Sequence, residues 1–173
     1  MQVSVFIATS LDGFIATAED GLDWLPGDDC EPHGYEEFIA SVDALVVGRR
    51  TYETVLTFED WPYQGKRVVV LSSQPLKVSA TGGPVERMGG TPKEILARLE
   101  AQGIRRIYLD GGITIQRFLR EGLVDRIIQT RVPVLLGGGI PLFGTLPREL
   151  RYRHVATRSF AGGLVQSEYE LPA

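Results

Sequence analysis

Short apolar segments rich in β-branched residues recur along the chain, and a helix-forming segment follows most of them. This alternation predicts an α/β domain with a mostly parallel central sheet, because a helix is the usual connection between parallel strands. The predicted strands are residues 3–8, 43–47, 67–71, 85–88, 106–109 and 124–132, and the predicted helices are residues 35–41, 50–56, 92–102 and 114–120. Thr91, Pro92 and Glu94 form a capping box that starts the third helix.

The last part of the chain predicts an antiparallel hairpin. Residues 150–159 and 164–170 flank an Ala-Gly-Gly turn. The length of 173 residues fits one domain, and we expect it to span residues 1–173.

Composition excludes several classes of protein. The net charge is −4, with 18 basic and 22 acidic residues, so the chain lacks the basic face that nucleic-acid binding needs. A single cysteine, Cys30, excludes an internal disulfide and favours a cytoplasmic location, and we expect no metal site. No apolar run reaches the roughly 18 residues of a membrane span, so no membrane association is expected.

Three predicted strand ends carry glycine, hydroxyl or arginine residues, at the edge where open α/β sheets bind ligands. Residues 48–51 read Gly-Arg-Arg-Thr, residues 71–73 read Leu-Ser-Ser and residues 111–114 read Gly-Gly-Ile-Thr. Helix-start N–H groups favour an anion, arginine forks hold phosphate, and glycine lets the backbone approach a diphosphate. Each segment alone also fits an ordinary turn, and the G-x-G-x-x-G motif is absent. Their recurrence on one sheet indicates a phosphate-bearing ligand.

The order and spacing of these segments resemble the dihydrofolate reductase superfamily over nearly the whole chain. Residues 8–16 look like the family's first strand and mobile loop, residues 24–26 like its Trp-Leu-Pro, and residues 48–52 like its Gly-Arg-x-Thr-aromatic motif. The resemblance implies a three-layer α/β/α fold. It also implies a Gly111–Gly112 pair joined by a cis peptide bond.

Two further segments resemble one branch of that superfamily. Residues 122–126, Gly-Leu-Val-Asp-Arg, and residues 133–139, Pro-Val-Leu-Leu-Gly-Gly-Gly, are similar to the reductase domain of bacterial riboflavin biosynthesis. Residues 48–52, Gly-Arg-Arg-Thr-Tyr, instead resemble the form that this motif has in folate reductases. This branch implies reduction of a ribosylaminopyrimidine phosphate by NADPH, and a homodimer. The predicted hairpin of residues 150–171 is long and partly apolar, so we expect the dimer to use the sheet edge or the hairpin surface.

The resemblance implies roles for individual residues. The proton donor is expected among Asp28, Asp29 and Glu36, and the substrate contacts among Asp12, Trp24, Tyr52, Lys66 and Thr130. Several of these residues could have a structural role in place of a functional one. Asp12 could belong to a turn, Asp28 and Asp29 could lie in a solvated loop, and Trp24, Tyr52 and Thr130 could serve packing. The expected NADPH-binding residues are Ala8, Ile15, Gly48, Arg49, Arg50, Thr51, Leu71, Ser72, Ser73, Gly111, Gly112, Ile113 and Thr114.

Three functions follow from this sequence. The first is an NADPH-dependent reductase of a pyrimidine or pteridine, most like 5-amino-6-(5-phosphoribosylamino)uracil reductase. The second is a dihydrofolate reductase. The third is a protein that binds NADPH without turnover, and the uncertain position of the acid keeps this alternative open.

Overall fold

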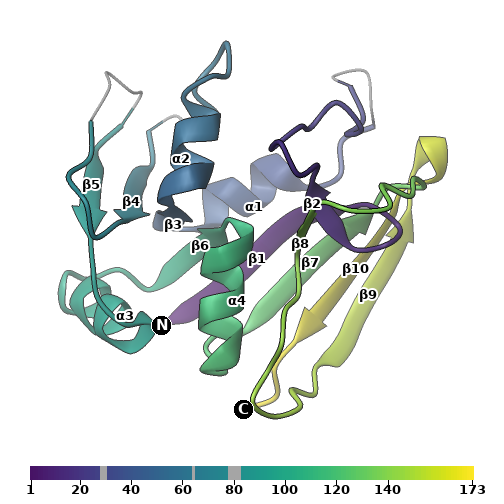
Figure 1. Cartoon of the computed structure of the whole chain (residues 1–173). Coiled ribbons are helices and arrows are strands. Elements are labelled where there is room, and N and C mark those ends of the chain that lie inside the picture. Colours follow the sequence, from purple (N-terminus) through teal and green to yellow (C-terminus); the bar gives the residue numbers. More distant parts are fainter. Residues whose placement is uncertain (28–30, 64, 78–82) are drawn as a thin grey trace.

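An eight-stranded sheet forms the centre of the molecule (Figure 1) in the computed structural model, which describes residues 1–27, 31–63, 65–77 and 83–173. The strand order is β5-β4-β3-β6-β1-β7-β10-β9; β5 through β7 are parallel, and β10 and β9 run antiparallel. The mostly parallel sheet with an antiparallel C-terminal hairpin is therefore confirmed. The strands are β1 (Gln2–Thr9), β3 (Ala44–Gly48), β4 (Arg67–Leu71), β5 (Val85–Met88), β6 (Arg106–Asp110), β7 (Arg126–Arg131), β9 (Arg153–Ser159) and β10 (Val165–Glu170).

Helices cover both faces of the parallel part of this sheet. The helices α1 (Tyr35–Ser41) and α2 (Arg49–Val55) pack on one face, and α3 (Pro92–Ala101) and α4 (Gly112–Arg120) pack on the other. A separate apolar core fills each interface, which confirms the expected three-layer α/β/α domain. Within the described part of the chain, no helix is long and apolar enough to cross a membrane.

The composition of β4 explains why this sheet is buried on both sides. Val68 and Val70 belong to the core beneath α1 and α2, whereas Val69 and Leu71 belong to the core beneath α3 and α4. Successive side chains of a strand point to opposite faces, so a strand with helices on both sides is apolar at every position. This continuous apolar run is the signal that identified the strand.

The start of α3 follows the predicted capping box. The Thr91 hydroxyl accepts a hydrogen bond from the Glu94 backbone N–H at 3.3 Å, and the Glu94 carboxylate accepts one from the Thr91 N–H at 2.8 Å. These two bonds satisfy N–H groups that a helix start otherwise leaves without partners. The bond from the Thr91 N–H to the Glu94 carboxylate is the largest cause of the lowered pKa of Glu94.

A small second sheet was not predicted from the sequence. It pairs β2 (Phe14–Ala16) with β8 (Ile140–Pro141), two strands that are too short for a periodic pattern to reveal. Gly139 permits this approach: a side-chain carbon there would lie 2.2 Å from the Ala16 carbonyl oxygen. This small sheet brings the segment after β1 and the segment before β8 together near the start of α4.

Candidate active site

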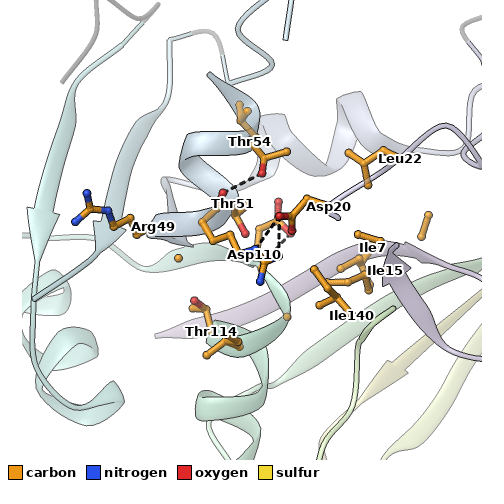
Figure 2. Close-up of a pocket in the computed structure, with 18 of the residues that line it drawn as sticks. Ile7, Ile15, Asp20, Leu22, Arg49, Thr51, Thr54, Asp110, Thr114 and Ile140 are labelled. Carbon is orange, nitrogen blue, oxygen red and sulfur yellow. Dashed lines mark hydrogen bonds and ion pairs between the residues drawn. The ribbon is translucent and has the colours of Figure 1, made fainter. Parts of the chain in front are cut away.

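A cleft of about 470 Å³ opens at the carboxyl ends of β1, β3, β4 and β6. Its walls come from α2, from the start of α4 and from the loop after β2, as Figure 2 shows. Arginine and threonine side chains gather at one end, which we call the arginine end: Gly48, Arg49, Arg50, Thr51, Thr114 and Arg117. Residues around the Asp110 carboxyl group line another part of the cleft, which we call the acid end: Phe6, Leu22, Leu25, Phe58, Tyr63 and Asp110.

Two glycine–threonine contacts shape the arginine end. A side-chain carbon at Gly111 would lie 2.5 Å from the Thr51 hydroxyl oxygen, and one at Gly48 would lie 2.7 Å from that of Thr114. Gly111 also has a φ of +96°, which disfavours residues with a side chain. The backbones of two strand ends and two hydroxyl groups therefore come together in a narrow cradle. The first N–H groups of the nine-residue helix α4 begin at this point.

The arginines of this end already have partners from the protein. Arg49 donates from Nε to Glu53 at 2.7 Å, and Arg50 donates from Nε to Asp20 in the loop after β2 at 2.8 Å. Both ion pairs are solvent-exposed, and such pairs contribute about 1 kcal/mol or less, so an incoming phosphate can compete for these guanidinium groups.

Ser72 lies beside the start of α2 because Gly48 pairs with Leu71 in the sheet. Its hydroxyl bonds with the backbone of Gln74, and its carbonyl accepts from Arg87 at 3.2 Å. Ser73 is exposed, and neither serine lines the cleft. Arg87 brings a further cation to this corner, and sequence reasoning did not identify it.

The small sheet closes the cleft beside the start of α4. A side-chain carbon at Gly112 would lie 3.0 Å from Ile15 and 3.1 Å from Ile140. Ile7, Ile15 and Ile140 lie together on the side of the cleft opposite Arg49 (Figure 2). A flat apolar group could therefore lie against this surface while its charged part points toward the arginine end.

Asp110 is the acid at the other end, and sequence reasoning did not identify it as functional. Its carboxylate accepts hydrogen bonds from the Tyr63 hydroxyl at 3.2 Å and from the Gly111 N–H at 2.8 Å. Burial raises the pKa of Asp110, and these two donors only partly offset the effect. A carboxyl group with a raised pKa that borders a cleft is a candidate proton donor.

Tyrosine rings supply the low-polarity surroundings of Asp110. Tyr63 and Tyr108 are 4% and 5% exposed, and Tyr108 donates to the Phe6 carbonyl at 3.0 Å. Burial, followed by the neighbouring Asp110 charge, raises the pKa of Tyr35, Tyr63 and Tyr108. These hydroxyls therefore stay protonated at neutral pH and can act as donors.

Many predicted cofactor residues meet at this one cleft, although no ligand tests their roles. The cleft is lined by Ala8, Ile15, Gly48, Arg49, Arg50, Thr51, Leu71, Gly111, Gly112, Ile113 and Thr114. The peptide bond between Gly111 and Gly112 is trans, so the expected cis bond is wrong. The positive φ of Gly111 provides the turn from β6 into α4 without it.

Several predicted substrate residues lie elsewhere. Lys66 donates to the Val42 carbonyl at 2.7 Å, beyond the end of α1, and Tyr52 is 1% exposed in the core. Thr130 is buried in β7 and accepts from Gln166 at 3.0 Å. Trp24 lines a separate hollow with Pro133 and Leu164. None of these four residues lines the cleft beside Asp110.

Asp12 joins two loops instead of lining the cleft. Its carboxylate accepts from the Ser10 hydroxyl at 2.6 Å and from the Gly137 N–H at 2.8 Å. The Ser10 bond is the largest cause of the lowered pKa of Asp12. Asp12 therefore fixes the turn before β2 against the segment before β8.

Of the three predicted proton donors, the structure describes only Glu36. Glu36 is exposed on the first turn of α1 and does not line the cleft, because that helix directs Phe38 toward the sheet. Asp28 and Asp29 lie outside the described residues.

The arginine end fits a dinucleotide cofactor. At the glycine–threonine cradle a ligand can come close to the backbone, and the arginines beside it can hold phosphate. The neighbouring isoleucines can cover a flat ring. Together with the sheet order, this defines an α/β domain of the dihydrofolate reductase-like class.

Comparison with known proteins gives the family. The family model for the RibD C-terminal domain matches residues 1–166, and the chain belongs to this family, the riboflavin-type reductase branch of the dihydrofolate reductase-like superfamily. The uncharacterized protein YwjB of Bacillus subtilis is 36% identical over 168 residues, which cover 95% of each chain.

Solved structures agree with this assignment. A provisionally named riboflavin biosynthesis protein of Shewanella sp. PV-4 has a TM-score of 0.92 and 41% identity, with 100% of both chains covered. The dihydrofolate reductase of Enterococcus faecalis, solved with NADP(H), has a TM-score of 0.69 at 19% identity and covers 99% of this chain and 97% of its own. That second likeness shows the fold alone. The riboflavin biosynthesis protein RibD of Corynebacterium ammoniagenes is 28% identical over 163 residues, which cover 84% of this chain and 48% of that protein.

Proposed function

We propose that this chain is an NADPH-dependent reductase of a small nitrogen heterocycle of the pyrimidine or pteridine type. The observation that carries the proposal is the position of Asp110, a carboxyl group with a raised pKa that shares one cleft with the glycine–threonine cradle. A protein that only binds a cofactor has no need for a half-buried acid at this position. Asp110 therefore favours turnover over the non-catalytic alternative.

In the proposed reaction, a C=N or C=O bond of the substrate gains a hydride at carbon and a proton at nitrogen or oxygen. NADPH, when bound, supplies the hydride and leaves as NADP⁺. Asp110 donates the proton and then regains one from solvent. Tyr63 keeps the carboxyl oriented through its hydrogen bond, and the aromatic side chains around it limit the access of water.

The arginine end supports NADPH over NADH. Arg49, Ser72 and Arg87 meet at neighbouring strand ends, where a 2′-phosphate would find guanidinium donors. Gly48, Thr51, Gly111 and Thr114 would hold the diphosphate, and Ala8, Ile15 and Ile140 would face the nicotinamide. These roles are part of the proposal.

The family suggests which substrates to test first. Membership of the RibD C-terminal domain family favours 5-amino-6-(5-phosphoribosylamino)uracil, and the shared fold makes dihydrofolate the second choice. The direct experiment follows NADPH absorbance in the presence of each compound and of other pteridines. We expect oxidation with at least one ring compound. Failure of the protein to bind NADPH, or tight NADPH binding without oxidation by any of them, would contradict the proposal.

We also propose a homodimer that uses the C-terminal hairpin. The strand β9 is the edge of the sheet, and Val155 and Val165 are 43% and 40% exposed on the hairpin. An exposed edge with apolar residues favours pairing with another chain. Light scattering at micromolar concentration should give about twice the 19.1 kDa of one chain, and a monomer mass would refute this assembly.

A further inference from the structure

The loop after β2, which we call the β2 loop (residues 17–26), lines both ends of the cleft. Asp20 lies on this loop beside the arginine end, and Leu22 and Leu25 of the same loop belong to the acid end. Arg50, in the first turn of α2, faces Asp20. The β2 loop therefore borders both the place where we propose the cofactor phosphates and the surroundings of Asp110.

A closed turn presents Asp20 to α2. The Thr17 hydroxyl accepts a hydrogen bond from the Gly21 N–H at 2.8 Å, and the Thr17 N–H donates to the Gly21 carbonyl at 3.0 Å. Asp20 has a φ of +64°, and in residues 1–27, 31–63, 65–77 and 83–173 it is the one residue other than glycine with a positive φ. This conformation costs a residue with a side chain about 1 kcal/mol, although aspartate and asparagine adopt it more readily than most.

Arg50 makes the polar connection between the β2 loop and α2. It donates to the Asp20 carboxylate from Nε at 2.8 Å and from Nη2 at 2.7 Å, and Nη2 also lies 3.5 Å from the Ala18 carbonyl. The dashed lines at Asp20 in Figure 2 mark this pair. Within the described part of the chain, no other hydrogen bond joins residues 18–26 to residues outside the loop. One guanidinium group therefore controls how the loop is held to α2.

The pair between Asp20 and Arg50 is easily exchanged for another anion. The two side chains are 32% and 58% exposed, and a pair in that setting contributes about 1 kcal/mol or less, which is similar to the cost of the positive φ. A phosphate carries more charge than a carboxylate and accepts two parallel bonds from an arginine fork. In the absence of a ligand, the Asp20 carboxylate thus occupies the guanidinium that a phosphate would bind more strongly.

We propose that Asp20 is an internal competitor for the cofactor phosphates, so that cofactor binding is coupled to release of the β2 loop. This inference rests on the proposed reductase function and adds a regulation of the same site. When Arg50 donates to a phosphate, Asp20 loses its partner, and the loop with Leu22 and Leu25 can move away from the acid end. Access to Asp110 then increases only after the cofactor is in place.

Asp20→Asn tests the competition. Asparagine keeps the size of the side chain and adopts a positive φ, but its amide has no charge to hold Arg50. Calorimetric titration with NADP⁺ at low salt should give a dissociation constant about threefold to fivefold lower than that of the wild type, the value of an exposed ion pair, and added salt should reduce the difference. Asp23→Asn is the matched control, because Asp23 is an exposed acid on the same loop that does not line the cleft. It should leave the dissociation constant unchanged.

A double-mutant cycle shows whether the effect acts through Arg50. In an Arg50→Ala background, Asp20→Asn should leave the dissociation constant for NADP⁺ unchanged, because the guanidinium for which the two anions compete is absent. General removal of negative charge from the cleft would instead lower the dissociation constant by the same factor in both backgrounds.

Trp24 reports on the position of the β2 loop. Its indole Nε1 donates to the Gly21 carbonyl at 3.3 Å, and its ring lines a hollow with Pro133. The nuclear magnetic resonance signal of this indole N–H, identified by its loss in Trp24→Phe, should move when NADP⁺ is added to the wild type. In ligand-free Asp20→Asn, the signal should already be displaced in the same direction.

The outcomes separate the two proposals. An unchanged dissociation constant in Asp20→Asn, an equal effect of this substitution in both backgrounds, or an indole signal that neither NADP⁺ nor Asp20→Asn moves would each overturn the competition and leave the reductase function in place. Failure of the wild type to bind either NADPH or NADP⁺ would overturn the proposed function itself.

Discussion

The two ends of the cleft differ in how their residues are distributed along the chain. The arginine end is built from short segments that are continuous in sequence, residues 48–51 and 111–114, each at a strand–helix junction. The acid end combines single residues from β1, the loop after β2, the segment after α2 and β6. Local motifs therefore reveal the arginine end and not the acid end. We expect substitutions at the acid end to change turnover and substitutions at the arginine end to change cofactor binding.

The largest expected effect is at the acid end. Asp110→Asn should lower kcat by about 10²- to 10⁴-fold, because the amide cannot replace the proton donor. The dissociation constant for NADPH should stay near that of the wild type, since the cradle is unchanged. Steady-state kinetics with calorimetry would show this. A variant that keeps full turnover would show that Asp110 is not the proton source.

Asp110 also predicts a pH dependence of stability. Its pKa is raised in the folded state, so the folded protein binds the proton more tightly than the unfolded chain. The free energy of unfolding should therefore fall as pH rises from about 4, the unfolded value, through the raised folded value. Asp110→Asn should lose this slope and melt at a higher temperature than wild type at pH 8. Identical pH slopes for both proteins would contradict the assignment.

At the arginine end, Gly111→Ala should reduce both stability and NADPH binding. The positive φ costs about 1–3 kcal/mol for a residue with a side chain, and the added carbon meets the Thr51 hydroxyl. Gly103→Ala is a matched control, because Gly103 has a φ of +85° but open space around it. Chemical denaturation of both variants separates backbone strain from the contact. Equal losses, with NADPH binding intact, would argue against a cradle.

The two arginines that begin α2 should differ in their importance for cofactor choice. Arg49→Ala should reduce the preference for NADPH over NADH by about tenfold or more, since it lies beside Ser72 at the adjacent strand end. Arg50→Ala should have a smaller effect, because Arg50 must first leave Asp20. Dissociation constants for both cofactors measure this. The opposite order would place the 2′-phosphate elsewhere.

The smallest expected effect is at Tyr63. Its hydroxyl lowers the pKa of Asp110, so Tyr63→Phe should raise that pKa and move the fall of kcat to higher pH. At low pH, kcat should change by less than about fivefold, the value of one hydrogen bond. A pH–rate profile is the measurement, and a shift to lower pH would contradict the assigned direction.

The sequence alone determined the alternation of strands and helices, the capping box of α3, and the meeting of the residue 48–51 and 111–114 segments at one edge. These features depend on neighbours in the chain: apolar runs, helix-start residues and glycines at turns. The resemblance also placed Lys66 and Thr130 at the substrate, whereas in the structure neither lines the cleft: Lys66 bonds to the Val42 carbonyl and Thr130 to Gln166.

Only the tertiary structure decided which acid faces the cleft. In the sequence, Asp110 is one of 22 acidic residues. The glycine pair that follows it indicates a contact between the backbone and a ligand and does not indicate a role for the aspartate side chain. Burial raises its pKa, and the residues that bury it include Tyr35, Tyr63 and Tyr108, which come from α1, the segment after α2 and β6. The acidity of a side chain depends on its surroundings in space, and parallel strand order determines those surroundings here through long-range packing.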